Sequence, residues 1–214
     1  MNEGRGRLLV VRHGESEWNA LGVWTGTTDV HLTPNGRHQA QLLGEAISSV
    51  KLDRAVASDQ IRTHETLDEM LLAMHQPSVP RTYSAALNER DYGEYTGKNK
   101  WEVKKQIGEA AFQDLRRGWN HAVPGGETLK AVYERTIPFY HETILPWLNA
   151  GETVLVVAHG NSIRSLQKYI ETISDAEVGD LEMLFGDIVI YHVDADGRMH
   201  DKSVTTTGIK PPPA

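Results

Sequence analysis

The feature that most constrains the fold is a regular alternation of short apolar runs with amphipathic segments. Residues 8–11 are four consecutive apolar residues, and Thr153–Ala158 forms a second, largely β-branched run. Runs of this length without polar alternation are typical of strands that are buried on both faces of a parallel sheet. Helical patterns lie between the strands. The sequence therefore predicts an α/β fold, a three-layer sandwich with a mostly parallel sheet and helices on both faces.

The helices and the remaining strands are predicted from capping residues and periodicity. Thr33 and Pro34 suit the N-cap and the first position of a helix, which residues 40, 43 and 47 then give one apolar face. Ser174 and Glu177 have the spacing of a capping box for one more short helix. The other predicted elements are strands at residues 54–57 and 188–193, and helices at residues 67–74, 100–117 and 128–148.

Composition limits the number of domains and the classes of partner. The chain has 214 residues, so we expect one domain over residues 1–208 and a disordered, proline-rich tail over residues 209–214. It has no cysteine, which excludes a disulfide scaffold and a thiolate metal site. No apolar run reaches about 18 residues, and residues 1–7 lack the apolar stretch of a leader, so we expect a cytoplasmic protein without membrane partners. The net charge of −7 argues against nucleic acid as a partner.

Both apolar runs end in a His-Gly turn. His13 follows the first run directly after Arg12, and His159 follows the second. Since such sheets bind ligands beyond the carboxyl ends of their strands, we expect the two imidazoles to converge on one ligand. Neutral imidazole is a nucleophile toward phosphorus, and the guanidinium of Arg12 would hold phosphoryl oxygens in a bidentate fork. Gly14 would let the backbone approach that ligand closely.

A zinc site is the alternative for the same two histidines, with Glu15 as a third ligand. Neither histidine belongs to a closely spaced ligand pair, however, and Arg12 would repel a dication. Two further segments favour a phosphoryl site. Arg62 stands where a helix begins after the second strand, a position suited to anion binding. Glu89, in the charged and glycine-rich segment 87–100, is a candidate general acid–base.

Four sequence blocks resemble the histidine phosphatase superfamily. They are Leu-Val-Val-Arg-His-Gly-Glu-Ser-Glu-Trp-Asn (9–19), Leu-Asn-Glu-Arg-Asp-Tyr-Gly (87–93), Tyr-Thr-Gly-Lys-Asn-Lys (95–100) and Ala-His-Gly-Asn-Ser (158–162). Arg-His-Gly alone indicates only the superfamily. The second and third blocks are more specific and resemble its cofactor-dependent phosphoglycerate mutase branch. Together the matches extend from about residue 8 to residue 193.

The resemblance implies a site and a reaction. His13 would carry a phosphoryl group, with Arg12, Arg62 and His159 around it and Glu89 as proton donor and acceptor. The substrate pocket would be lined by Asn19, Thr25, Gly26, Tyr92, Lys100, Arg116, Arg117, Gly160 and Asn161. The reaction implied is the interconversion of 2-phosphoglycerate and 3-phosphoglycerate in glycolysis and gluconeogenesis, primed by 2,3-bisphosphoglycerate and needing no metal. The partner implied is a small anionic phosphorylated substrate, and a homodimer is left open.

Two further points leave alternatives open. Arg116 and Arg117 would hold the substrate's carboxylate and second phosphate, or would only complement a helix C-terminus before Gly118. The segment 118–124 is shorter than in typical members, in which it helps to cover the pocket, and Leu-Phe-Gly at 184–186 replaces the family's Pro-Thr-Gly. A less complete cover favours the alternative function, a phosphohistidine phosphatase with water as the acceptor.

Overall fold

The computed structural model describes residues 6–181 and 185–209, which are built around one six-stranded sheet. The strand order is β3-β2-β4-β1-β5-β6. The pairs β1–β4, β2–β4 and β2–β3 are parallel, whereas β5 runs antiparallel to β1 and β6 antiparallel to β5. The strands are β1 (Arg7–Arg12), β2 (Arg54–Ala57), β3 (Arg81–Tyr83), β4 (Thr153–Ala158), β5 (Asp187–Val193) and β6 (Met199–Thr206).

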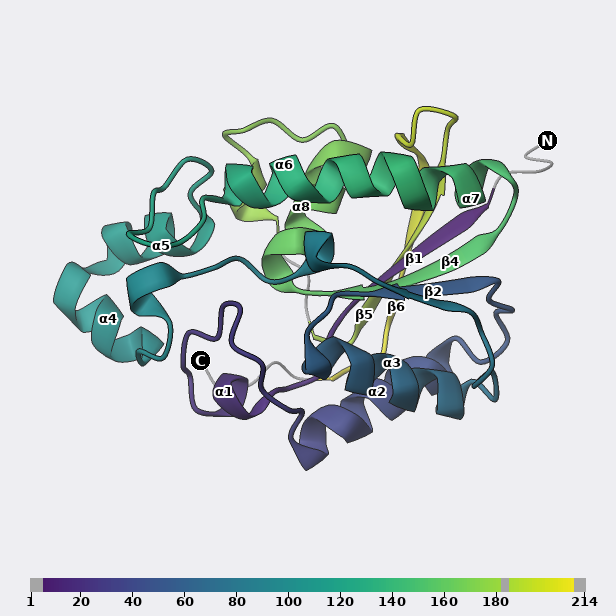
Figure 1. Cartoon of the computed structure of the whole chain (residues 1–214), viewed down its shortest axis with the longest axis horizontal. Coiled ribbons are helices and arrows are strands. Elements are labelled where there is room, and N and C mark those ends of the chain that lie inside the picture. Colours follow the sequence, from purple (N-terminus) through teal and green to yellow (C-terminus); the bar gives the residue numbers. More distant parts are fainter. Residues whose placement is uncertain (1–5, 182–184, 210–214) are drawn as a thin grey trace.

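Helices cover both faces of this sheet (Figure 1). Helices α2 and α3 lie on one face, α6, α7 and α8 lie on the other, and α4 and α5 lie beyond one end of the sheet. The predicted α/β sandwich with a mostly parallel sheet is therefore confirmed. The helices are α1 (Glu17–Ala20), α2 (Pro34–Ala46), α3 (Ile61–Ala73), α4 (Lys100–Ile107), α5 (Glu109–Arg117), α6 (Leu129–Phe139), α7 (Leu145–Asn149) and α8 (Gly160–Ile170).

The two core layers follow from the period of two along the central strands. In β1, Leu8 and Val10 pack into the cluster under α6 and α8, while Leu9 and Val11 pack into the cluster under α2 and α3. The same division holds along β4, all of whose residues are buried. Since both faces of these strands are covered by apolar side chains, β1 and β4 give the sheet a rigid centre from which a site can be positioned.

Several predicted elements differ in their extent. Thr33 does cap α2, since its hydroxyl oxygen accepts a hydrogen bond from the Gly36 N–H. The single helix predicted over residues 100–117 is wrong, because Gly108 adopts a positive φ of 81° and divides it into α4 and α5. The helix predicted over residues 128–148 is a run of α6, a π-helical turn (Tyr140–Ile144) and α7.

Near the end of the chain the structure adds to the sequence prediction. Ser174 and Glu177 form the reciprocal contacts of the predicted capping box, but only the 3₁₀ turn Val178–Asp180 follows it. The strand predicted at 188–193 is confirmed as part of β5, whereas the edge strands β3 and β6 were not predicted. The predicted tail lies, except for residue 209, outside the described residues. None of the described helices is long and apolar enough to cross a membrane.

Candidate active site

The register of the two central strands brings the two His-Gly turns together. Arg12, the last residue of β1, lies opposite Ala158, the last residue of β4, and the His13 N–H donates to the Ala158 carbonyl at 3.0 Å. His13 and His159 directly follow these two strands, and their ring centroids lie 4.9 Å apart. The imidazoles therefore converge at the carboxyl ends of two adjacent parallel strands, as the sequence predicted.

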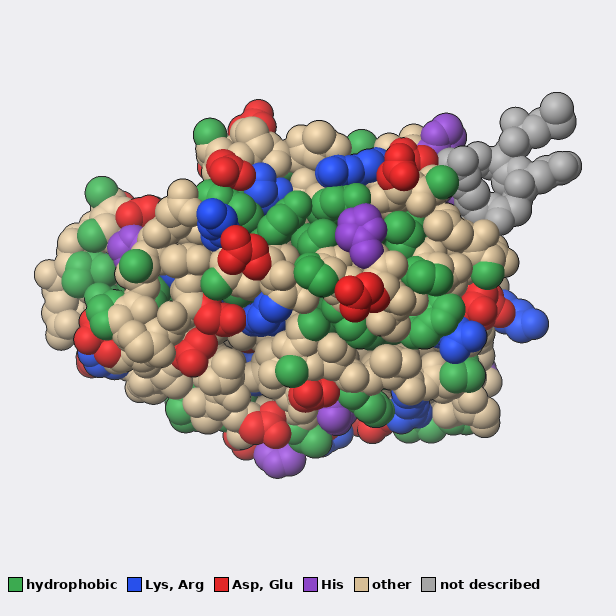
Figure 2. Space-filling view, turned by 45° about the horizontal axis from the view of Figure 1, so that its top comes forward, with side chains coloured by type: hydrophobic (Ala, Val, Ile, Leu, Met, Phe, Trp, Pro, Cys, Tyr) green, Lys and Arg blue, Asp and Glu red, His purple; other side chains and the backbone are tan. Residues whose placement is uncertain are grey.

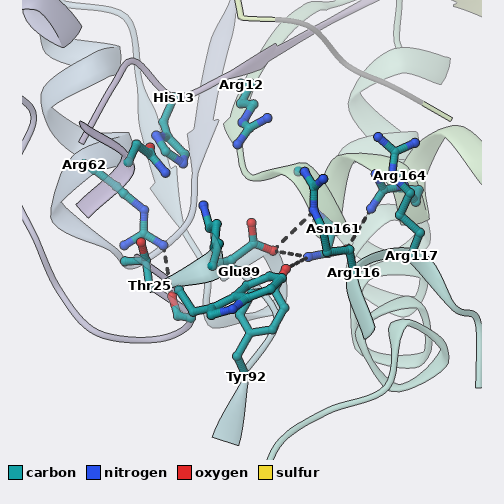
Figure 3. A pocket seen from close by; sticks show the side chains of 15 residues that line it. Arg12, His13, Thr25, Arg62, Glu89, Tyr92, Arg116, Arg117, Asn161 and Arg164 are labelled. Carbon is teal, nitrogen blue, oxygen red and sulfur yellow. Dashed lines mark hydrogen bonds between the residues drawn. The ribbon is translucent and has the colours of Figure 1, made fainter. Parts of the chain in front are cut away.

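A cavity opens at this edge of the sheet (Figure 3). All of the expected site residues except His159 line it. His159 is fully buried, with its ring beside that of His13. Trp24 and Arg164 line it as well, and Arg164 was not expected. The lining residues are Arg12, His13, Asn19, Trp24, Thr25, Gly26, Arg62, Glu89, Tyr92, Lys100, Arg116, Arg117, Gly160, Asn161 and Arg164.

The environment of His13 leaves one ring nitrogen available. Its Nδ1 lies 2.7 Å from the Gly14 carbonyl oxygen, which only accepts, so Nδ1 carries the proton and Nε2 has a lone pair. Burial, together with Arg62 and Arg12, lowers the pKa of His13 well below its ordinary value, so the ring is neutral at neutral pH. A buried neutral imidazole with an unprotonated Nε2 is suited to attack phosphorus.

Gly14 has a packing role that was not expected. A Cβ at this position would lie 2.3 Å from the Gly36 carbonyl oxygen at the start of α2. The residue therefore allows the turn after β1 to pack against the backbone of α2, and the expected approach to a ligand stays a prediction. Its N–H donates to the Thr66 hydroxyl on α3, which ties the turn to the other helix of this layer.

Glu89 is oriented by donors that converge on one of its oxygens. Its Oε1 accepts from the Arg90 N–H at 2.8 Å, from the Asn161 Nδ2 at 2.9 Å and from the Asn161 N–H at 3.2 Å. Asn161 also donates to the Tyr92 hydroxyl, and its Oδ1 accepts from the Arg164 Nη1 at 2.8 Å. Arg164 therefore positions the amide that positions Glu89. The sequence signal that could have identified Arg164 is its position three residues after Asn161, which places both side chains on one face of α8.

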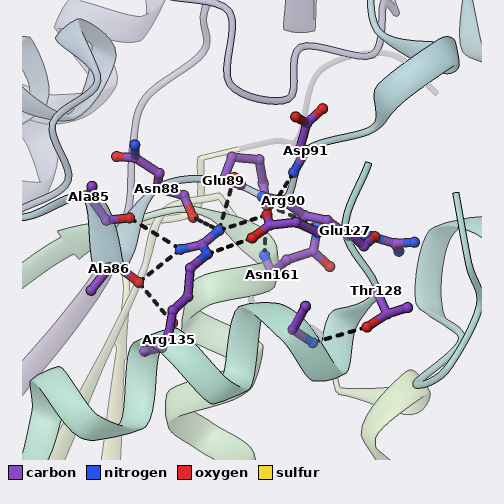
Figure 4. A network of polar contacts seen from close by, with 12 residues as sticks. Ala85, Ala86, Asn88, Glu89, Arg90, Asp91, Glu127, Thr128, Arg135 and Asn161 are labelled. Carbon is purple, nitrogen blue, oxygen red and sulfur yellow. Dashed lines mark hydrogen bonds and ion pairs between the residues drawn. The ribbon is translucent and has the colours of Figure 1, made fainter. Parts of the chain in front are cut away.

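The segment that carries Glu89 is anchored by Arg135 of α6 (Figure 4). The guanidinium of Arg135 forms an ion pair with Glu127, and Glu127 Oε2 in turn accepts from the Asp91 N–H. Because one rigid guanidinium binds four backbone carbonyl oxygens, it fixes where residues 85–89 lie. The carbonyl oxygens that accept from Arg135 are those of Ala85, Ala86, Asn88 and Glu89.

Phe185 contacts the end of the site that holds Arg12 and His13. Its ring centroid lies 4.0 Å from the Arg12 guanidinium carbon and 6.4 Å, edge-on, from the His13 ring. The side chain is buried, so it shields both residues from water on that side. Phe185 belongs to the stretch at 184–186 that departs from the family pattern, and Leu184 of that stretch lies outside the described residues.

Cations surround the cavity although the chain as a whole is acidic. The cavity is lined by Arg12, Arg62, Lys100, Arg116, Arg117 and Arg164, and Glu89 is the only carboxylate among its described lining residues. Figure 2 shows acidic and basic side chains interspersed over one outer face, in contrast to the cavity, where cations predominate. Local potential in a cleft governs the capture of a small anion, which a net charge of −7 therefore does not oppose.

Lys100 should make the binding of an anion dependent on pH. Burial, with Arg12 and Arg116 nearby, lowers the pKa of Lys100 to about 8, so the ammonium loses its charge as the pH rises through that value. Loss of this charge should raise KM for an anionic substrate about tenfold between pH 7 and pH 9, in addition to the pH dependence of other groups in the site. Lys100→Arg should remove this tenfold part of the rise, because a guanidinium stays charged. An equal rise in both proteins would contradict this role of Lys100.

The zinc alternative receives no support from the geometry. Within residues 6–181 and 185–209, no three or more His, Asp or Glu side chains are grouped as metal ligands. Glu15, the third ligand of that alternative, instead accepts a hydrogen bond from the Thr33 hydroxyl at 2.7 Å. Its side chain therefore supports the start of α2.

Comparisons with known proteins agree with this site. Residues 8–204 match the histidine phosphatase superfamily (branch 1). A 2,3-bisphosphoglycerate-dependent phosphoglycerate mutase of Xanthobacter autotrophicus is 39% identical over 91% of this chain and 95% of its own length. A phosphoglycerate mutase of Schizosaccharomyces pombe is 38% identical over 92% of this chain and 94% of its own length.

Solved structures share the fold. YhfR of Bacillus stearothermophilus has a TM-score of 0.78 at 27% identity and covers 91% of this chain and 94% of its own. A mycobacterial glucosyl-3-phosphoglycerate phosphatase has a TM-score of 0.81 at 22% identity and covers 94% of this chain and 98% of its own. With two histidines at adjacent strand ends, a match that spans nearly the whole chain and relatives of this similarity, the chain belongs to the histidine phosphatase superfamily, branch 1.

Proposed function

We propose that the chain interconverts 2-phosphoglycerate and 3-phosphoglycerate through a phosphohistidine at His13, primed by 2,3-bisphosphoglycerate. The observation that carries the proposal is a second group of cations in the same cavity. Arg12 and Arg62 lie with His13, while Lys100, Arg116 and Arg117 come from α4 and α5. A monoester with a single anionic group needs only the first group. A molecule with a phosphate and a second phosphate or carboxylate would use both.

In the proposed mechanism His13 Nε2 attacks a phosphorus of the bisphosphate, and the bond from that phosphorus to the substrate oxygen breaks. Glu89 gives its proton to the departing oxygen, which becomes the hydroxyl of the monophosphate. In the reverse direction Glu89 removes a hydroxyl proton and the oxygen takes the phosphoryl group from His13. If the bisphosphate reorients in the cavity between these two steps, the phosphate that returns to His13 comes from the other carbon. The monophosphate that is released is then the other isomer. Donors from Arg12, Arg62 and His159 would stabilise the charge on the transferring oxygens.

Hydrolysis of phosphate monoesters is the second candidate. It uses the same His13 chemistry with water as the acceptor, and the short segment 118–124 favours it because less chain is available to cover the cavity. That segment is nevertheless anchored, since the His121 carbonyl accepts from Arg90 Nη2 and Val123 is buried in the cluster formed by α4 and α5. The solved structure that is named as a glucosyl-3-phosphoglycerate phosphatase has the same fold, which supports hydrolysis as the second candidate.

One assay separates the two functions. Purified protein, freed of metal with a chelator, is given 3-phosphoglycerate with and without 2,3-bisphosphoglycerate, and both 2-phosphoglycerate and inorganic phosphate are measured. We expect isomerisation that depends on priming and exceeds phosphate release by about 100-fold or more, a difference in barrier of roughly 3 kcal/mol. Phosphate release as fast as isomerisation would contradict the mutase function and favour the phosphatase function. Phosphate release from a generic aryl phosphate that is faster than isomerisation would do the same.

A further inference from the structure

A buried chain of hydroxyl groups leads away from His159. The Ser58 Oγ lies 2.8 Å from the His159 Nε2 and 2.8 Å from the Thr63 Oγ1. Ser58 follows β2 and Thr63 lies in the first turn of α3, and the side chains of all three residues are fully buried. Neither Ser58 nor Thr63 lines the cavity, so these hydroxyls can act on the chemistry only through His159.

The hydrogen-bond partners fix the direction of every proton in this chain. The Thr63 hydroxyl lies 2.8 Å from the Gln60 carbonyl oxygen, which can only accept, so Thr63 donates its one proton there. The Ser58 hydroxyl must then donate its own proton to Thr63 Oγ1. Ser58 Oγ already accepts from the Gln60 N–H, and its remaining lone pair faces His159. That lone pair requires a proton on His159 Nε2.

The other nitrogen of the ring, Nδ1, is then unprotonated in the neutral state. It is buried and has no hydrogen-bond partner among the described residues. His13 has the opposite arrangement, with the proton on Nδ1 and the lone pair on Nε2. The two neighbouring rings are thus held in different tautomers. The nitrogens that make no hydrogen bond to the protein, His13 Nε2 and His159 Nδ1, are both unprotonated. Neither can therefore donate a hydrogen bond to an anion.

We propose that the Ser58–Thr63 hydroxyl pair holds His159 as its Nε2–H tautomer, so that His159 hydrogen-bonds a phosphoryl group only after Nδ1 takes up a proton. The inference rests on the proposed function, in which a phosphoryl group occupies the space beside His13. Ser58 and Thr63 are positioning residues in this scheme. His159 is the group that would contact the anion, because its ring, although not part of the cavity lining, lies 4.9 Å from that of His13.

The charges around His159 explain why the proton is absent before the anion arrives. Arg12 and His13 face it from the end of β1, Arg62 from α3 and Arg135 from α6. Burial and these groups lower the pKa of His159 well below its ordinary value, so the ring is neutral at neutral pH. A doubly negative phosphoryl group reverses the local field and favours the imidazolium. Anion binding and proton binding are therefore linked, and each strengthens the other.

The linkage has a measurable size. If one proton is taken up for each anion, the affinity for the anion falls about tenfold for each pH unit above neutrality. Sulfate is the probe, because its own charge does not change in this range. Lys100, with a pKa of about 8, adds its own dependence above that value, so the slope is measured between pH 6.5 and pH 7.5.

Thr63→Val and Thr63→Ser are the matched variants. Valine has the shape of threonine but offers no acceptor to Ser58, whose hydroxyl is then free to donate to His159 Nε2, which favours the Nδ1–H tautomer. That tautomer donates to sulfate without taking up a proton. We expect Thr63→Val to flatten the pH dependence of sulfate affinity several-fold, and Thr63→Ser to restore it, since serine returns the hydroxyl.

Imidazole ¹⁵N resonances report the tautomer directly, in protein without sulfate and without any turnover. At pH 7 we expect His159 as Nε2–H in the wild type and in Thr63→Ser, a shift to Nδ1–H in Thr63→Val, and a doubly protonated His159 after sulfate is added to the wild type. Wild-type His159 as Nδ1–H, an unchanged tautomer in Thr63→Val, or sulfate binding without protonation of His159 would each overturn the inference. Since the anion-free spectra need no activity, the inference and the proposed reaction can fail independently.

Discussion

Replacing His13 by alanine is expected to eliminate the phosphoenzyme and to lower turnover by about 10⁴-fold or more. The reason is that Nε2 of this ring is the nucleophile of the proposed reaction, while Nδ1 is bound to the Gly14 carbonyl. The measurement is transfer of labelled phosphate from 2,3-bisphosphoglycerate to the protein, with turnover assayed in parallel.

His38→Ala is the control for this experiment. His38 is exposed on α2 and has no part in the cavity, so both labelling and turnover should stay at the wild-type level. The label on the wild-type protein should be acid-labile and stable to base, as a phosphoramidate is. A labelled His13→Ala protein, or one with more than a few per cent of wild-type turnover, would exclude His13 as the acceptor.

The part of the site that sequence could predict is the part carried by regular structure. The residues after β1 and β4 were predicted to converge because an apolar run without alternation indicates a central parallel strand. The resulting parallel pair has Arg12 opposite Ala158, which makes His13 and His159 neighbours. Arg62 was also placed at the start of a helix, where it is found in α3. In each case the position follows from strand or helix geometry alone.

What sequence could not predict depends on contacts between distant segments. Arg135 binds the backbone of residues 85–89, which lie 46 to 50 positions earlier in the chain. Nothing in the local pattern of α6 distinguishes this arginine from a solvated one. The break at Gly108 is similar, because a single glycine within a helical pattern is tolerated in many helices. The hydroxyl chain from His159 to Thr63 joins β4 to β2 and α3, and it required the folded arrangement to be recognised.

Glu89→Gln should lower isomerisation of phosphoglycerate by about 10²- to 10⁴-fold, the usual range for loss of a general acid–base. The glutamine keeps an oxygen that can accept the three N–H groups now bound by Oε1, so the segment should hold its position. Its other terminal atom is an amide nitrogen, which neither gives up nor takes up a proton at neutral pH. Phosphorylation of His13 by 4-nitrophenyl phosphate should fall much less, because nitrophenolate leaves without being protonated. Both rates are measured on the same preparations.

The comparison between the two substrates decides which role Glu89 has. If the carboxyl group transfers a proton, the loss depends on the basicity of the leaving group, whereas a positioning defect lowers both rates equally. Glu94→Gln is the matched control, since Glu94 is exposed in the same segment and should leave both rates unchanged. Tyr92 does not provide an alternative base in Glu89→Gln, because burial raises the pKa of its phenol and the hydroxyl keeps its proton. A large loss with phosphoglycerate, a small loss with the aryl ester and an unchanged Glu94→Gln protein would therefore assign the proton transfer to Glu89.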